Sequence, residues 1–303
     1  MQGLREKMEQ KTELEKLARK IDEEYNNEIK HVIQRFRGER TRVSISSGSS
    51  QILDEYIDKR QKEVVSKILN TNEQIGTVID AGCGAGRWTD FFCKRAKEVV
   101  GVDKSLDMLR IAKTGKRRNA YFLRSSMTSL PFKDNSFDLS FCSFSLLLII
   151  HESDFSKAVS ELIRVTKPGG KIIIIDITAK TPLITAWTLR RTPNQYIKAF
   201  LLHGAVLKDV FGYYIDLPIR GYQFICKKLL KPFWKRESQD FGNDFWRWIE
   251  GKGGMLRHIV EFSLKLIILF MYPLDKMFAE RLFQPICPEK VFVFEKMEDS
   301  KWK

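Results

Sequence analysis

A glycine-rich turn that follows directly on an apolar segment constrains this chain more than any other feature. The stretch reads Val78-Ile-Asp-Ala-Gly-Cys-Gly-Ala-Gly-Arg-Trp88, with glycine at alternate positions of the turn. Glycine lets the backbone take left-handed dihedral angles and approach a ligand closely. The pattern therefore predicts a buried strand that ends in an acid, Asp80, and runs into a turn suited to a nucleotide-like ligand.

A second apolar segment, Glu98-Val-Val-Gly-Val-Asp103, also ends in an acid. It lies about 20 residues past the turn, where α/β nucleotide folds place the carboxylate that binds ribose hydroxyls. Asp103 could instead cap a helix that begins near Ser105, and the two roles can coexist. The glycine spacing differs from the dinucleotide fingerprint G-x-G-x-x-G, so the turn alone does not identify the ligand.

Further motifs follow the two acids in a fixed order: Leu130-Pro-Phe132, Asn135-Ser-Phe-Asp138 and Glu161-Leu-Ile-Arg-Val-Thr-Lys-Pro-Gly-Gly170. Together with the glycine turn, this order resembles the class I S-adenosylmethionine-dependent methyltransferases over roughly residues 77–176. The resemblance is greatest to the branch similar to ubiquinone and menaquinone biosynthesis enzymes, which methylates small molecules. A dehydrogenase has no reason to combine these motifs at these distances.

The resemblance implies an α/β fold, a Rossmann-like sheet of seven mostly parallel strands with helices on both faces. We expect an N-terminal helical cap over residues 1–70 and a cofactor-binding core over 71–180. Residues 181–285, rich in aromatic and basic side chains, are expected to form a helical insertion that serves as a substrate lid. Residues 286–303 are expected to supply a final antiparallel edge strand, since Lys290-Val-Phe-Val-Phe-Glu295 alternates as strands do.

The resemblance also implies a site for S-adenosylmethionine. Asp80 would face the cationic amino acid end of the cofactor, Asp103 would bind the ribose diol, and Lys104 would cover the adenine. Relatives carry an acid after the third strand, where this chain has Ser125 or Ser126. The residues expected to bind the cofactor are Asp80, Ala81, Gly82, Cys83, Gly84, Gly86, Asp103, Lys104, Ser125, Ser126, Met127 and Ser143.

The catalytic base is less clearly marked. Relatives often carry a histidine pair after the fourth strand, where this chain has Leu146-Leu-Leu148. His151 follows closely and is the candidate base, although a histidine at a helix start is an equally good interpretation. Methyl transfer is an in-line displacement at a cationic sulfur, so alignment of the reactants can supply much of the catalysis. Tyr25 and Tyr56, in segments before the core, are candidate substrate residues.

The charge balance bears on the acceptor. The chain of 303 residues has 52 Lys and Arg against 38 Asp and Glu, a net charge of +14. Such an excess attracts anionic membrane surfaces, nucleic acid or phosphorylated substrates, although a lysine-rich proteome would also produce it. The apolar run from Phe262 to Tyr272 is too short to span a bilayer. We expect a buried helix there, with a membrane-surface or lipid-binding element as the alternative.

These observations rank the candidate functions. A methyltransferase acting on a small or lipid-linked acceptor, such as a lipid, a quinone-like compound or a glycan intermediate, comes first. An RNA methyltransferase ranks lower because we find neither an RNA-binding module nor an amino-methylation motif. A non-catalytic cofactor-binding scaffold is a further alternative, because the histidine pair is missing.

Cysteine usage and the N-terminus indicate the compartment. The charged N-terminus lacks an apolar signal segment, which favours the cytoplasm, with peripheral membrane contact as an option. The irregular N-terminal apolar stripe does not specify a coiled-coil dimer, so the oligomeric state stays open. The cysteines show neither a C-x-x-C pair nor metal-ligand spacing, which predicts a reducing compartment and no metal site; they are Cys83, Cys93, Cys142, Cys226 and Cys287.

Overall fold

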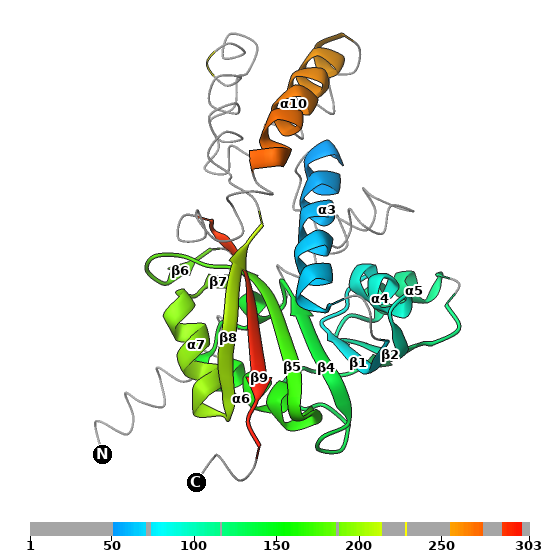
Figure 1. Ribbon diagram of the computed structural model, residues 1–303, viewed down its shortest axis with the longest axis vertical. Helices are drawn as coiled ribbons and strands as arrows, with labels where there is room; N and C mark the ends of the chain where they lie inside the picture. The colour runs from blue at the N-terminus through cyan, green and yellow to red at the C-terminus, as the bar shows by residue number, and fades with distance from the viewer. Residues whose placement is uncertain are drawn as a thin grey trace, which may run out of the picture.

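The computed structural model places one large sheet at the centre of the protein (Figure 1). Its seven strands run in the order β3-β2-β1-β4-β5-β9-β8, and β1 to β5 are all parallel. Since β9 is antiparallel to both of its neighbours, β8 points the same way as the first five strands. This confirms the Rossmann-like, mostly parallel sheet. The strands are β1 (Ile75–Ala81), β2 (Ala96–Asp103), β3 (Ala120–Arg124), β4 (Phe137–Ser143), β5 (Thr166–Ile177), β8 (Ala205–Gly212) and β9 (Glu289–Lys296).

The structure describes part of the chain: residues 51–70, 74–115, 117–185, 188–213, 228, 255–274 and 287–298. Tyr25, and with it most of the predicted N-terminal cap, lies outside these residues. So does most of the predicted insertion. Within the described part, a two-stranded sheet of β6 (Leu183–Ile184) and β7 (Leu189–Arg190) accompanies the large one.

Helices cover both faces of the large sheet. Strand β5 shows why, because side chains alternate along a strand. Ile173 and Ile175 pack with α3, α4 and α10, whereas Ile172 and Ile174 pack with α6 and α7. The helices are α3 (Gln51–Ile68), α4 (Arg87–Cys93), α5 (Leu106–Lys113), α6 (Glu152–Val165), α7 (Pro193–Leu202) and α10 (Met255–Leu274), with a 3-10 turn η1 (Leu146–Leu148).

Two expectations about the last strands were wrong. Strand β9 does not lie at the edge of the sheet, because β5 pairs with one side of it and β8 with the other. Its first six residues are all buried, as in an interior strand covered on both faces. The edge strand is β8, which falls inside the segment expected to be a helical insertion. A register shift between Leu207 and Asp209 interrupts its alternation, so its sequence does not read as a strand.

Two further expectations concerned burial. The apolar run in α10 is helical, but only one side of the helix is buried, through Val260, Leu264 and Met271. The side that carries Phe262 and Phe270 is exposed, so the expected buried helix is corrected to a half-exposed one. Tyr56 belongs to α3, and its side chain is buried in the core between this helix and the sheet. That position explains its apolar ring as packing.

Candidate cofactor-binding and active site

The glycine turn joins β1 to α4 at the carboxyl end of the sheet's strands. Gly82, Gly84 and Gly86 have φ angles of 76°, 51° and 84°, in the left-handed region that only glycine adopts without strain. The amide of Gly82 donates to the carbonyl of Val102 at 2.7 Å, which fastens the turn to β2. A Cβ atom at Gly82 would collide with the side chain of Ser145. The turn therefore needs glycine for both its conformation and its space.

Asp103 at the end of β2 links this turn to the next helix. Its Oδ2 accepts the amide of Gly84 at 2.8 Å, and its Oδ1 accepts the amide of Ser105 at 2.8 Å. The cap of α5 is Ser105, whose Oγ accepts the amide of Met108, so Asp103 is not the capping residue. Burial raises the pKa of Asp103, and the two amides oppose that effect. One carboxylate thus fixes both loops.

Asp80 is enclosed beneath the turn, with only 1% of its surface exposed. Thr89 of α4 donates its hydroxyl to Asp80 Oδ2 at 2.6 Å. Burial raises the pKa of Asp80 to about 6, although the Thr89 hydrogen bond and the nearby charge of Arg87 lower it. This hydrogen bond joins the end of β1 to α4, on either side of the turn.

A cavity of about 330 Å³ opens beside the turn. This volume is at the lower end of the roughly 300–1,000 Å³ that small-molecule sites occupy. One side is polar, with Asp103 and hydroxyls of the loop after β3, and the other is apolar. The lining residues are Gly82, Val102, Asp103, Lys104, Ser125, Ser126, Met127, Thr128, Ser145, Leu148, Ile149, Ile150, His151 and Asp154.

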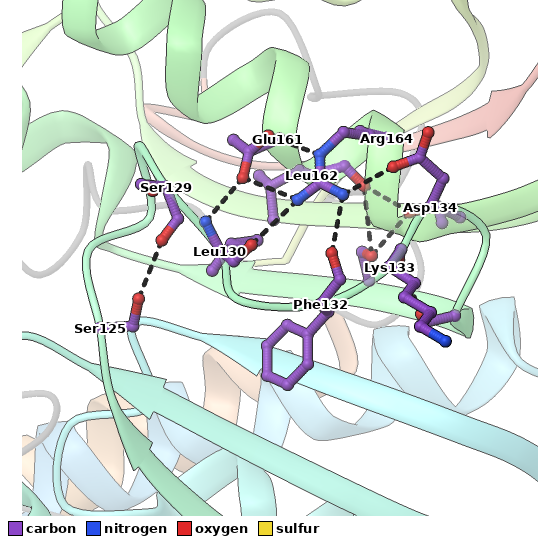
Figure 2. A network of polar contacts seen from close by, with 12 residues as sticks. Ser125, Ser129, Leu130, Phe132, Lys133, Asp134, Glu161, Leu162 and Arg164 are labelled. Atoms are coloured by element: carbon purple, nitrogen blue, oxygen red, sulfur yellow. Dashed lines mark hydrogen bonds and ion pairs between the residues drawn. The ribbon is translucent and has the colours of Figure 1, made fainter.

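The loop after β3 forms the polar wall, and α6 fixes its position (Figure 2). Arg164 donates to the carbonyls of Leu130 and Phe132 at 2.9 and 2.7 Å. Glu161 accepts the amide of Leu130 at 2.6 Å and binds Arg164 in turn, and this hydrogen bond from Arg164 is the main reason why the pKa of Glu161 is lowered. Ser125 donates its hydroxyl to the carbonyl of Ser129 at 2.9 Å within the same loop. These contacts join the Leu-Pro-Phe motif to the Glu-Leu-Ile-Arg motif.

Helix α3 is tied to the glycine turn through a buried arginine. Arg87, the first residue of α4, makes an ion pair with Asp58 at 2.9 Å and donates to Gln61 Oε1 at 2.9 Å. It also reaches Ser143 at the end of β4, at 3.4 Å. Gln61 in turn donates to the hydroxyl of Tyr213 at 2.8 Å, just past β8. This network holds α3 over the carboxyl end of the sheet.

His151 lies on the apolar side of the cavity, directly before α6. Its side chain makes no capping hydrogen bond to the helix. Asp154, one turn further on, lines the same cavity. The imidazole and Asp103 therefore line one cavity, although 48 positions separate them in the chain.

The structure separates the expected cofactor residues into two groups. Those that line the cavity are Gly82, Asp103, Lys104, Ser125, Ser126 and Met127. Those outside its lining support it from behind. Burial raises the pKa of the Cys83 thiol, and Ser143 contacts Arg87. The expected residues outside the lining are Asp80, Ala81, Cys83, Gly84, Gly86 and Ser143.

Several lining residues were missed by sequence reasoning. Most follow β4, where Ser145 donates its hydroxyl to the carbonyl of Gly82 at 3.2 Å. Phe144, just before it, has a left-handed φ of 52°. This conformation is not expected for a phenylalanine from the sequence. Ile149 and Ile150 read as ordinary core residues. Their only signal was their position after a strand's carboxyl end, where ligands of open α/β sheets bind.

Comparison with known proteins tests the site as a whole. Residues 78–170 match a family model described as a methyltransferase domain. The chain is 36% identical over 120 residues to a demethylmenaquinone methyltransferase of Paenarthrobacter aurescens, covering 40% of this chain and 44% of that protein. The chain contains a class I methyltransferase domain. A malonyl-[acyl-carrier protein] O-methyltransferase of Buchnera aphidicola is 40% identical over 101 residues, covering 33% of this chain and 39% of that protein.

The similarity to these relatives covers only part of each protein. The chain spans less than half the length of these two curated relatives. Among solved structures, a putative sarcosine dimethylglycine methyltransferase from Galdieria sulphuraria aligns with a TM-score of 0.55 and 15% identity, covering 89% of this chain and 98% of that one. The [4+2]-cyclase SpnF aligns with a TM-score of 0.53 and 15% identity, covering 88% and 93%. These likenesses show the fold alone, and a cyclase shares it.

S-adenosylmethionine is the cofactor of a domain of this family. The chain's residues fit it. Gly82 lines the cavity with its bare backbone, and a carboxylate lines the same cavity at Asp103. No helix in the described ranges combines the length and the apolar character needed to cross a membrane.

Proposed function

We propose that this protein transfers a methyl group from S-adenosylmethionine to a small or lipid-linked acceptor. The observation that carries the proposal is one cavity whose lining includes both Asp103 and His151. It pairs a carboxylate suited to a diol with a group suited to accepting a proton. The curated relatives act on demethylmenaquinone and on malonyl-[acyl-carrier protein], which supports an acceptor of this size class.

On the donor side, Asp103 would accept hydrogen bonds from the ribose diol. Both of its oxygens already hold backbone amides, so the carboxylate is oriented before any ligand arrives. The serines after β3 would face the adenine edge, since Ser125 and Ser126 line the polar wall. S-adenosylmethionine supplies an electrophilic methyl group on a cationic sulfur. Asp80 would act as a positioning residue, because it contacts the turn's helix and lies outside the lining.

On the acceptor side, His151 would take the proton that the acceptor loses on methylation. A neutral imidazole has a lone pair on one ring nitrogen and can therefore accept a proton as a general base. Leu148, Ile149 and Ile150 form an apolar wall next to it, which favours an acceptor with an apolar body.

Access to the site would pass the helices at the carboxyl end of the sheet. We propose that α3, held there by Arg87, forms part of a cap over the acceptor. Helix α10 packs against α3 and extends the same layer, so it belongs to the lid (Figure 1).

The first test is cofactor binding, measured by titration calorimetry. Asp103→Asn keeps the size of the side chain but removes its charge, and we expect the affinity for S-adenosylmethionine to fall by at least about tenfold, or 1.4 kcal/mol. Asp107→Asn serves as the matched control and should bind normally, because this acid of α5 lies outside the cavity lining and its side chain is 47% exposed. Equal affinity in the Asp103 and Asp107 variants would contradict the assigned donor site.

The second test identifies the acceptor. The protein is incubated with methyl-labelled S-adenosylmethionine and separate pools of lipids, small metabolites, protein and RNA. Label in the lipid or small-metabolite pool supports the proposal, label in RNA identifies an RNA methyltransferase, and label in none favours a non-catalytic scaffold. With the acceptor found, His151→Ala should lower turnover by about 10² to 10⁴ while cofactor affinity is unchanged. His203→Ala is the control, because His203 lies at the end of α7 and hydrogen-bonds with Ser156 of α6.

A further inference from the structure

Helix α10 has two apolar sides, and the sheet layer uses only one of them. Val260, Leu264 and Met271 face the core that α3 and α4 share. The other side is exposed although most of its side chains are apolar. Its exposed fractions are 57% for Ile259, 64% for Phe262, 40% for Leu266, 67% for Leu269, 72% for Phe270 and 49% for Leu274.

These exposed residues form one continuous face. Each of them lies three or four positions from another member of the set, from Ile259 to Leu274, which places them along a single stripe of the helix. No charged residue interrupts the stripe. Lys265 is exposed at its margin, where a long cationic side chain can reach past an apolar face. A contiguous apolar face of this kind marks a binding surface.

Positive charge gathers beside this face. Tyr272 near the end of α10 donates its hydroxyl to Glu63 of α3 at 2.7 Å, and the Nζ of Lys59 lies 4.2 Å from the centre of the Tyr272 ring. This contact leads into a surface groove between α3 and α4. The groove is lined by five basic residues, Lys59, Lys62, Lys67, Lys94 and Arg95, and by three acids, Asp58, Glu63 and Asp90.

The acids of the groove are already engaged by arginines of the protein. Asp58 pairs with Arg87 at 2.9 Å and also with Lys62 of the groove at 2.6 Å. Glu63 pairs with Arg60 at 2.5 Å, and Asp90 pairs with Arg117. Five basic residues still stand against three acids in the lining. The lysines of the lining therefore outweigh the carboxylates in the charge presented to a partner. Such a surface attracts an anionic partner over a distance of about 10 Å at moderate ionic strength.

The geometry points to an anionic lipid bilayer as the partner of this surface. We propose that α10 lies in the membrane interface, with the stripe from Ile259 to Leu274 among the acyl chains and the α3–α4 groove against the lipid headgroups. An interfacial helix combines an apolar face with flanking cations and does not cross the bilayer. A helix of 20 residues is about 30 Å long, so its whole length can lie in the interface plane.

The position of α10 relates membrane docking to the cavity. Helix α3, on which it stands, is tied to the glycine turn through Arg87. Figure 1 shows α10 beyond the end of the sheet, on the side of α3. A bilayer bound by α10 would therefore lie near the carboxyl end of the strands, where the cavity opens. The proposal goes beyond the proposed reaction and does not depend on it.

The test is co-sedimentation with vesicles of phosphatidylcholine alone or mixed with phosphatidylglycerol. We expect the wild-type protein to bind the mixed vesicles and to bind less as salt is added. The double substitution Phe262→Gln and Phe270→Gln should reduce binding by on the order of tenfold or more. The matched control is Ile184→Gln with Leu202→Gln, which removes two side chains that are 65% and 62% exposed on other elements.

Folding and cofactor binding serve as controls, since all variants should keep the wild-type circular dichroism and affinity for S-adenosylmethionine. As a second measurement, an environment-sensitive dye on Phe270→Cys should shift to the blue with mixed vesicles, and on Leu202→Cys it should not. Absence of wild-type binding, or equal binding by both double variants, would overturn the proposal. So would self-association of the wild type that the α10 variant abolishes without any vesicle binding, since a second copy would then cover the face.

Discussion

The arginine that holds the polar wall of the cavity allows a quantitative prediction. Arg164 makes an ion pair with Glu161 and another with Asp134, and it donates to the carbonyls of Leu130 and Phe132. Its side chain is 29% exposed, so water can replace only part of these contacts. We choose Arg164→Ala because it removes all of them together while leaving the backbone of α6 unchanged.

The expected loss of stability follows from the individual contacts. A hydrogen bond from a charged donor contributes about 1.5–3 kcal/mol, so the two carbonyl contacts amount to about 3–6 kcal/mol. Asp134 is 68% exposed, and its ion pair adds about 0–1 kcal/mol at most. Hydration of the freed carbonyls in the variant offsets part of the total. We therefore expect Arg164→Ala to lower the free energy of unfolding by about 3 kcal/mol.

The assay is urea denaturation, with the free energy of unfolding extrapolated to water. Arg110→Ala is the matched control, because its ion pair with Asp107 joins side chains that are 70% and 47% exposed, and it should cost less than about 0.5 kcal/mol. Arg164→Lys keeps the charge but loses the planar fork, so its stability should fall between wild type and alanine. Equal stability of the Arg164 and Arg110 alanine variants would refute the reasoning. Cofactor affinity should also fall in Arg164→Ala, since Ser125 and its neighbours lose their support.

Further predictions concern the turn and a buried acid. Gly82→Ala should abolish measurable cofactor binding in calorimetry, and Ser145→Gly in the same chain should restore part of it, because the collision is with Ser145; no restoration would show that backbone strain alone is responsible. Burial raises the pKa of Asp176 from 3.8 to about 7, so the folded protein holds a proton that the unfolded chain has released. Wild-type stability should therefore fall relative to Asp176→Asn as the pH rises from about 4 to 7. Parallel urea-denaturation stability curves for the two proteins across that range would contradict this assignment.

Local sequence was sufficient to predict the structure where a residue type favours one backbone conformation or one position in the fold. The alternate glycines at 82, 84 and 86 predicted a turn with left-handed backbone, and all have positive φ. Asp103 was expected at the site because an acid that ends a strand lies at the sheet's ligand-binding edge, and it lines the cavity. The motif order from Leu130 to Gly170 resembled that of the family, and in the structure Arg164 and Glu161 join the two ends of this stretch through contacts to Leu130.

Partner choice between distant segments could not be read in the same way. The sequence analysis assigned no partner to Arg87, yet it contacts Asp58 across 29 positions and fixes α3. Strand β9 was expected at the edge because it comes last in the chain, although strand order depends on pairing and not on sequence order. The apolar wall at Ile149 and Ile150 reads as core in sequence. Only the fold brings it beside His151.

The sequence by itself determined the glycine turn and the acid at the end of β2, because backbone conformation depends on residues a few positions apart. Its motif order implied the parallel sheet through the resemblance to a family. Tertiary structure decided which side chains share the cavity and which side of α10 is covered. Periodicity shows that a helix has an apolar face, but not what lies against it. Which side is buried depends on contacts between residues far apart in the chain, such as the hydrogen bond from Tyr272 to Glu63. These contacts form only in the folded protein.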